Sequence, residues 1–188
     1  MARRFRHVSQ GMYGAWRLAR LDSAAMALFE RSPAGVWRSF YGAALAFPGF
    51  LLAWAWYVPP ARWIEPGLTT VLLLLTLAYI ALRAAFPLII LPFCDWIERE
   101  EQSLDLIIAY NWSLVLQSAL AVSVIFAART LPEPVAGLFA IAAAMARLGY
   151  EWFIARTALE AGGVAATVVV LIDLVLAAAL GTLAQSLG

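Results

Sequence analysis

The sequence predicts an all-α integral membrane protein: a bundle of five transmembrane helices with an N-terminal interfacial amphipathic helical segment. Composition is one reason, because the 188 residues are 64% hydrophobic and only 13% charged, with a mean hydropathy of +0.83, unlike a soluble domain. The other reason is length. Five apolar stretches reach the roughly 20 residues that span a hydrocarbon core of about 30 Å. They lie at approximately 36–58, 68–93, 104–128, 134–156 and 164–184.

Residues 1–35 are predicted to form a basic cytoplasmic segment, and residues 36–188 the five-span membrane domain. Residues 1–38 carry seven arginines against two acids, a formal +5, while the rest of the chain carries six arginines against ten acids, a formal −4. Positively charged segments stay on the cytoplasmic side. We therefore expect a bacterial cytoplasmic (inner) membrane location with a cytoplasmic N-terminus and, after five crossings, a periplasmic C-terminus. Polar residues 7–11 follow the first arginines, so no cleaved signal peptide is expected.

The stretch 12–31 before the first span mixes aromatic and apolar side chains with arginine. We expect one or two short helices along the cytoplasmic interface, with rings at headgroup level and arginines near anionic lipid headgroups. A helix packed against the cytoplasmic ends of the bundle is the alternative. Asp22 or Ser23 is a candidate cap, and Ser32 before Pro33 predicts the N-cap and first position of the first span. The predicted interface residues of the whole N-terminal segment are Arg3, Arg4, Arg6, Trp16, Arg17 and Arg20.

Turn-forming residues separate the five stretches. The predicted connections contain Pro59, Pro60, Pro66 and Gly67, then the loop 95–103, then 132–134, then Gly162 and Gly163. These connections are short, so the predicted bundle is compact. Prolines inside the spans are expected to bend the first two helices: Pro48, Pro87 and Pro92. A bend at Pro87, one turn beyond Arg83, is either a hinge or a way to fit a long helix into the bilayer.

Four charged residues lie well inside the apolar stretches, away from their ends: Arg83, Arg147, Glu151 and Asp173. A lone charge there is costly, so intramembrane charges normally face a bundle interior and pair. Arg147 and Glu151 are four residues apart and share a helix face, while Arg83 and Asp173 pair with each other or join a four-residue network. Counting about 1.5 Å per residue from the cytoplasmic ends puts this polar layer roughly 8–15 Å deep. Neutral hydrogen bonds are expected from the third span: Tyr110, Asn111 and Gln117.

The two positive and two negative charges of this network cancel, and three interpretations follow. The network fixes helix register only, or it lines a proton or solute path, or it forms an intramembrane enzyme around a water-accessible pocket at Asp173 and Glu151. Parts for enzymatic chemistry are few, because His7 is the only histidine, Cys94 is the only cysteine and no glycine-rich phosphate loop occurs. We expect no catalytic residue, metal site or cofactor, and no nucleic-acid partner, since lipid better explains the basic tip.

Four segments carry a resemblance to known proteins. They are 28–40 (LFERSPAGVWRSF), 109–113 (AYNWS) after an REE loop, 152–159 (WFIARTAL) and 171–176 (LIDLVL). With them, the chain resembles small multi-pass membrane proteins of alphaproteobacterial type, sometimes labelled transporters, over nearly its whole length. Thirteen arginines and no lysine are compatible with a GC-rich bacterial source. The five-span plan is also similar, in architecture only, to Yip1-type proteins, which are associated with trafficking factors in eukaryotes. Neither resemblance implies a biochemical activity.

The sequence therefore favours a non-enzymatic membrane scaffold or accessory subunit with a buried, neutralised polar network. Small residues in the last two spans, Ala140 with Ala144 and Ala177 with Gly181, allow helices to approach closely. Other membrane proteins or a second copy of the chain are thus candidate partners, besides anionic lipid. The alternative function is a small solute or proton-coupled transporter that uses the intramembrane charges.

Overall fold

The computed structural model describes residues 2–59 and 67–186, with side chains for residues 7–59 and 67–183. Every regular element in these ranges is a helix. The bundle consists of α2 (Pro33–Tyr57), α4 (Leu68–Trp96), α5 (Glu100–Thr130), α6 (Glu133–Leu159) and α7 (Gly163–Ser186). Before it come α1 (Ala2–Ala19) and the short 3-10 helix η1 (Ser23–Leu28).

Five of these helices, α2, α4, α5, α6 and α7, are long and apolar enough to cross a membrane. This confirms the predicted all-helical class and the number of candidate spans, and it indicates a membrane protein. The helices extend beyond most of the predicted limits. At about 1.5 Å per residue, the 29 residues of α4 and the 31 residues of α5 exceed the roughly 20 needed to span a bilayer.

The connection between α4 and α5 is shorter than the predicted loop 95–103. Helix α4 continues to Trp96 and α5 already begins at Glu100. Two acidic residues in the first turn of α5, Glu100 and Glu101, face the positive end of its helix dipole and favour this early start. The turn itself is made by Glu98, whose φ of 59° is left-handed. The acidic residues that looked like a solvated loop therefore begin a helix.

Two predicted caps are present at the N-terminal end of the bundle. The Ser32 hydroxyl oxygen accepts a hydrogen bond from the amide of Gly35 at 3.0 Å, and Pro33 is the first residue of α2. The Asp22 carboxylate accepts from the amide of Ala24 at 3.1 Å and caps η1. The Ser32 hydroxyl also donates to Glu30 at 3.1 Å. This bond, with Arg38 alongside, holds the pKa of Glu30 below its usual value of 4.5.

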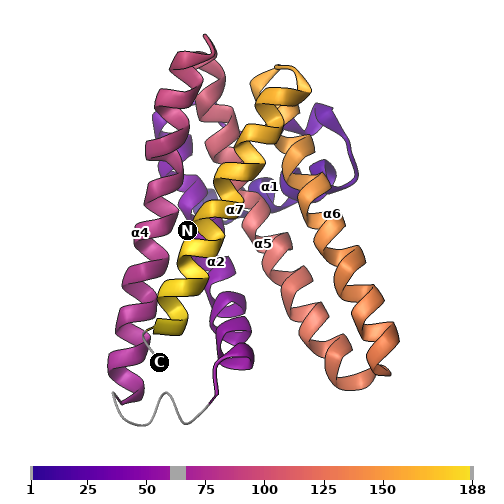
Figure 1. Cartoon of the computed structure of the whole chain (residues 1–188). Coiled ribbons are helices and arrows are strands. Elements are labelled where there is room, and N and C mark those ends of the chain that lie inside the picture. Colours follow the sequence, from indigo (N-terminus) through magenta and orange to yellow (C-terminus); the bar gives the residue numbers. More distant parts are fainter. Residues whose placement is uncertain (1, 60–66, 187–188) are drawn as a thin grey trace.

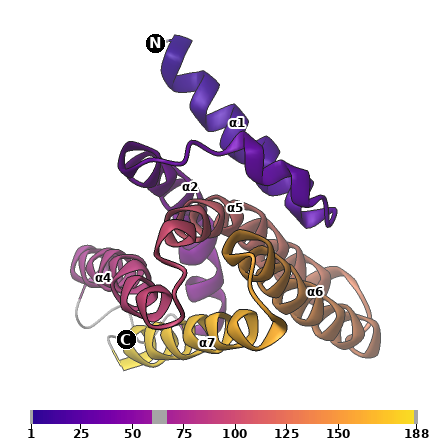
Figure 2. The ribbon, with the colours of Figure 1, turned by 90° about the horizontal axis from the view of Figure 1, so that it is seen from above.

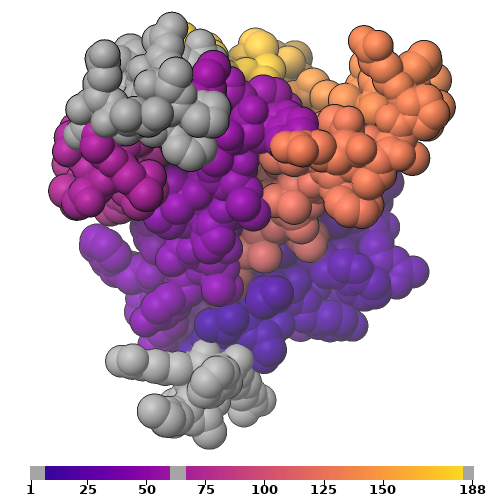
Figure 3. Space-filling model, turned by 90° about the horizontal axis from the view of Figure 1, so that it is seen from below, coloured from indigo at the N-terminus to yellow at the C-terminus, as the bar shows by residue number. Residues whose placement is uncertain are grey.

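Helix α5 lies at the centre of the bundle and packs against α2, α6, α1 and α4, while α7 packs against α6 and α4 (Figures 1 and 2). Seen from the end that carries the α5–α6 turn, α2 lies between α4 and that helical hairpin (Figure 3). None of the three internal prolines ends its helix, because α2 and α4 run unbroken through Pro48, Pro87 and Pro92. Because α5 contacts four other helices, its side chains contribute most to the centre of the bundle.

Helix α1 crosses the bundle helices on the outside, beside α5 and α6 (Figures 1 and 2). Its inner face has small residues, and Gly11 lies so close to the indole of Trp112 that a side chain there would overlap it. The Tyr150 hydroxyl donates to the carbonyl of Ala15 at 2.8 Å. The other face leaves Trp16 exposed. Packing against the bundle, one of the two predicted alternatives, is thus present, and the exposed face stays free for the predicted lipid interface.

Candidate functional site

Asp173 of α7 is the centre of a charged network that joins four helices. Its side chain is only 2% exposed. One carboxylate oxygen, Oδ2, accepts from Arg147 Nη2 of α6 at 2.5 Å, and the other, Oδ1, accepts from the Tyr110 hydroxyl of α5. Both oxygens of a buried carboxylate are therefore partnered, as burial in a low-dielectric interior requires.

Arg147 holds both carboxylates of the network. Its Nη2 also lies 2.9 Å from Oε1 of Glu151, one helical turn along α6. Its Nε donates to the side-chain oxygen of Gln117 at 3.1 Å, and Gln117 in turn donates to Ser113 at 3.0 Å. One guanidinium thus ties α5, α6 and α7 together, a task for which its planar set of donors is suited.

Glu151 is the least satisfied member of the network. Its side chain is 3% exposed and forms the ion pair with Arg147. Neither of its oxygens has a well-oriented hydrogen bond. The attraction between Glu151 and Arg147 is therefore a charge–charge interaction without a well-directed hydrogen bond. Asp173, in contrast, accepts two hydrogen bonds.

Arg83 of α4 joins the network through Tyr110 and not by direct contact with Asp173. Its Nη1 donates to the Tyr110 hydroxyl oxygen at 3.2 Å. The guanidinium carbon also lies 5.5 Å from the ring centroid of Tyr79 and 6.0 Å from that of Tyr110, within the range of a cation–π contact. Of the two predicted arrangements, the structure has the four-residue network rather than two separate pairs, with a tyrosine hydroxyl as the link.

The Tyr110 ring is held where its hydroxyl can make this link. Phe86 of α4 is fully buried and stacks on it, with ring centroids 3.7 Å apart and planes 13° from parallel. The hydroxyl oxygen accepts a hydrogen bond from Arg83, and the single hydroxyl proton is donated to Asp173. A tyrosine hydroxyl can make both bonds at once, because it is one donor and also an acceptor. The sequence analysis predicted a neutral hydrogen bond from Tyr110, but not that its hydroxyl would link Arg83 to Asp173.

Asn111 does not belong to the network, although it was predicted to join it. Its amide nitrogen donates to the Ser39 hydroxyl of α2 at 2.8 Å. Asn111 and Tyr110 are adjacent on a helix, so their side chains point in directions about 100° apart. Asn111 therefore faces α2 while Tyr110 faces α4 and α7. Its contact fastens α2 to α5, next to the close approach of Gly42 to the α5 backbone.

Asp105 is a charged residue of the third span that the sequence interpretation missed. Its side chain is 4% exposed and pairs with Arg31 Nε, just before α2, at 2.9 Å. It sits second in the predicted stretch 104–128, so a count of acids inside that stretch would have found it. Its partner comes from the N-terminal segment, which shows that this segment is bound to the bundle by charge as well as by packing.

The other predicted interface residues lie on or beside α1. Arg17 pairs with Asp22, and Arg20 lies 4.8 Å from the ring of Trp16. Both arginines therefore have contacts within the N-terminal segment. The contact of Arg20 is a cation–π contact with the exposed ring of Trp16. The side chains of Arg3, Arg4 and Arg6 lie outside the described residues.

The network borders an open cavity of about 300 Å³ that is lined by residues of all five bundle helices. Most of its polar lining comes from the network: Arg83, Tyr110, Gln117, Arg147 and Asp173. The remaining lining is largely apolar or small, including Gly49, Ala53, Ala177 and Gly181. The charged groups therefore border an open space between the helices as well as contacting one another.

Within the part of the chain that the structure describes, no group of three or more His, Cys, Asp or Glu side chains is placed to hold a metal ion. Cys94 is buried at the end of α4, among apolar neighbours. No protein-family model, no curated protein and no solved structure matches the chain. The two resemblances drawn from the sequence therefore stay predictions.

Proposed function

We propose that this chain is a non-enzymatic membrane scaffold or accessory subunit whose charged network holds its helices in a fixed register. The observation that supports this most is at Arg147, which contacts Asp173, Glu151 and Gln117 on three helices. With Arg83 linked through Tyr110, the charges sum to zero. Breaking a buried ion pair is costly, so a neutral, internally paired set of charges favours one fixed arrangement of the helices, as a static support requires.

The proposed setting is a bacterial cytoplasmic (inner) membrane, with the N-terminus in the cytoplasm and the C-terminus in the periplasm. Two facts support this orientation: the basic N-terminal segment and five candidate spans, an odd number. Anionic lipid at α1 and other membrane proteins or a second copy are the proposed partners. Reporter enzymes fused to each end test the orientation, and a periplasmic reporter that is active at the N-terminus would contradict it.

A small solute or proton-coupled transporter is the second candidate, and the cavity of about 300 Å³ beside Arg147 and Asp173 favours it. A carrier needs charged groups that reach a space open to each side in turn and change partners there. The proposed carrier residues are the four charges of the network.

Asp173→Asn separates the two functions in vesicles that contain the purified protein and a pH-sensitive dye. For a scaffold, wild-type vesicles leak protons no faster than protein-free vesicles, and Asp173→Asn lowers the unfolding temperature in detergent. Proton flux in the wild type that Asp173→Asn abolishes, with the unfolding temperature unchanged, would refute the scaffold and support the carrier. Asp95→Asn is the matched control, because this exposed aspartate lies at the end of α4.

A further inference from the structure

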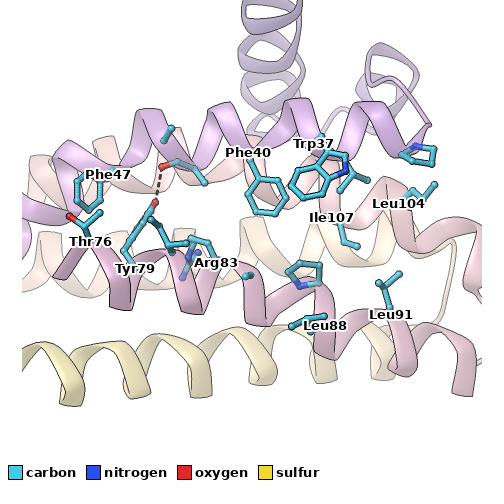
Figure 4. A pocket seen from close by; sticks show the side chains of 17 residues that line it. Trp37, Phe40, Phe47, Thr76, Tyr79, Arg83, Leu88, Leu91, Leu104 and Ile107 are labelled. Atoms are coloured by element: carbon cyan, nitrogen blue, oxygen red, sulfur yellow. Dashed lines mark hydrogen bonds between the residues drawn. The ribbon is translucent and has the colours of Figure 1, made fainter. Parts of the chain in front are cut away.

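A second and larger cavity, of about 790 Å³, lies between α2 and α4 with α5 behind it. Figure 4 shows its side chains along the two helices. The lining is almost entirely apolar and includes three aromatic residues of α2, Trp37, Phe40 and Phe47, opposite Leu88 and Leu91 of α4. We call this space the α2–α4 cleft. Its volume is in the range of pockets that bind small molecules, about 300–1,000 Å³.

The cleft exists because the backbones of α2 and α4 stay apart, and large side chains fill the space between them toward one end. There, Trp54 of α2 and Val58, which directly follows α2, pack with Val71 and Leu75 of α4. Further along α4, the Tyr79 hydroxyl crosses to the Ala43 carbonyl of α2 at 2.8 Å (Figure 4). Beyond this bond, α2 packs against α5, and the space beside α4 stays open.

Arg83 is the charged residue in the lining of the cleft. It lies 13 residues from Trp96 and 15 from Leu68, so it is about 20 Å from each end of α4. The residue is 9% exposed, and its Nε is buried without a hydrogen-bond partner. Two other side chains of the lining, Thr76 and Tyr79, already donate to the backbone carbonyls of Leu72 and Ala43. The indole of Trp37 is 78% exposed, so its donor is not buried. Arg83 therefore brings to the cleft a guanidinium whose Nε no acceptor among the described residues satisfies.

We propose that the α2–α4 cleft binds a membrane-soluble molecule with an apolar tail and a neutral, carbonyl-bearing ring, of the isoprenoid-quinone type. The carbonyl oxygen accepts from Arg83, the ring lies among Phe40, Phe47 and Tyr79, and the tail follows Leu88 and Leu91. Aromatic side chains favour a flat ring at this position. A buried donor without a partner is costly, and a carbonyl removes that cost.

The charge balance of the network selects a neutral head over an anionic one. Arg83 already offsets one of the two carboxylates, Asp173 and Glu151, while Arg147 offsets the other. An anion at Arg83 would leave one excess negative charge far from both ends of the helix, which membranes disfavour strongly. A carbonyl supplies the acceptor and leaves the total charge at zero.

Three probes with alkyl tails of nine or ten carbons test the proposal on the full chain in phosphatidylcholine nanodiscs. Decylubiquinone carries carbonyls, decylbenzene carries a ring without an acceptor, and decanoate carries an anion. We expect only decylubiquinone to raise the unfolding temperature in a saturable titration. We expect binding about tenfold weaker in Arg83→Gln, because a hydrogen bond from a charged donor is lost.

Two alanines of α4 provide the blocking variant and its control. Ala84 lines the cleft and Ala81 does not, and both are exposed in the structure, so neither substitution disturbs the core. Ala84→Phe is expected to abolish the quinone shift, and Ala81→Phe to leave it unchanged. Four results would each overturn the proposal: no shift with decylubiquinone, an equal shift in Ala84→Phe, equal binding of decylbenzene, or binding of decanoate alone.

Discussion

Arg147→Gln removes the cation that holds the two buried carboxylates of the network. Asp173 and Glu151 then share the bundle with Arg83, which reaches Asp173 only through the Tyr110 hydroxyl. Each carboxylate is at most 3% exposed, so water does not replace the lost partner. Removing one member of a buried ion pair costs about 3–5 kcal/mol, because the other charge stays buried and uncompensated.

We expect the lower end of that range, about 3 kcal/mol. The Arg147 side chain is itself 32% exposed, so its ion pairs are partly screened by solvent and their removal costs the protein less stability. For a chain of 150–250 residues, 1 kcal/mol shifts the unfolding temperature by about 2–4 °C. The expected fall is therefore about 6–12 °C, measured by tryptophan fluorescence during heating in mild detergent.

Arg156→Gln is the matched control for this measurement. Arg156 is exposed on the same helix and lies 5.2 Å from the ring of Trp152. An exposed cation–π contact contributes about 0.5–1 kcal/mol, so a fall of only about 1–4 °C is expected. If Arg147→Gln unfolds at the same temperature as Arg156→Gln, the reasoning about buried charge is refuted.

Three further predictions concern packing, pH and the N-terminal segment. Gly42→Ala should lower stability by about 1–3 kcal/mol, since a Cβ there meets the backbone of α5, whereas Gly137→Ala, with open space around it, should not; chemical unfolding of both variants checks this. The pKa of Glu30 is lowered in the folded chain, so the stabilisation that its carboxylate gives the folded state is present above the usual pKa and is lost as pH falls through the folded-state pKa. Glu30→Gln should therefore lower the unfolding temperature at neutral pH but not in strong acid. Arg31→Ala should destabilise the chain by about 1–3 kcal/mol by leaving Asp105 buried and unpaired, and adding Asp105→Asn should recover part of the loss; an additive further loss would argue against the ion pair.

The five candidate spans could be predicted from the sequence because they depend on local quantities. The length and hydropathy of a stretch decide whether it can cross a bilayer, and caps such as Ser32 with Pro33 depend on neighbouring residues. The contact between Arg147 and Glu151 is also local, because residues four apart meet on any helix. The helix ends were harder to predict from the sequence. Glu100 and Glu101 are polar, as loop residues often are, and yet they stabilise the start of α5.

Contacts between helices needed the structure. Which neighbour a buried side chain faces depends on the rotation of each helix about its axis, so the sequence did not separate Asn111, which bonds Ser39, from Tyr110, which links Arg83 to Asp173. The α2–α4 cleft likewise depends on how far two helices diverge. Residue types along one helix do not encode that distance.

The most direct test of the account is a double-mutant cycle between Arg147 and Asp173, followed by thermal unfolding. If these charges neutralise each other between α6 and α7, Arg147→Gln combined with Asp173→Asn leaves one cation and one carboxylate in the network. The double variant should then be more stable than Arg147→Gln alone, because the uncompensated carboxylate is gone. A double variant whose loss equals the sum of the two single losses would contradict the network.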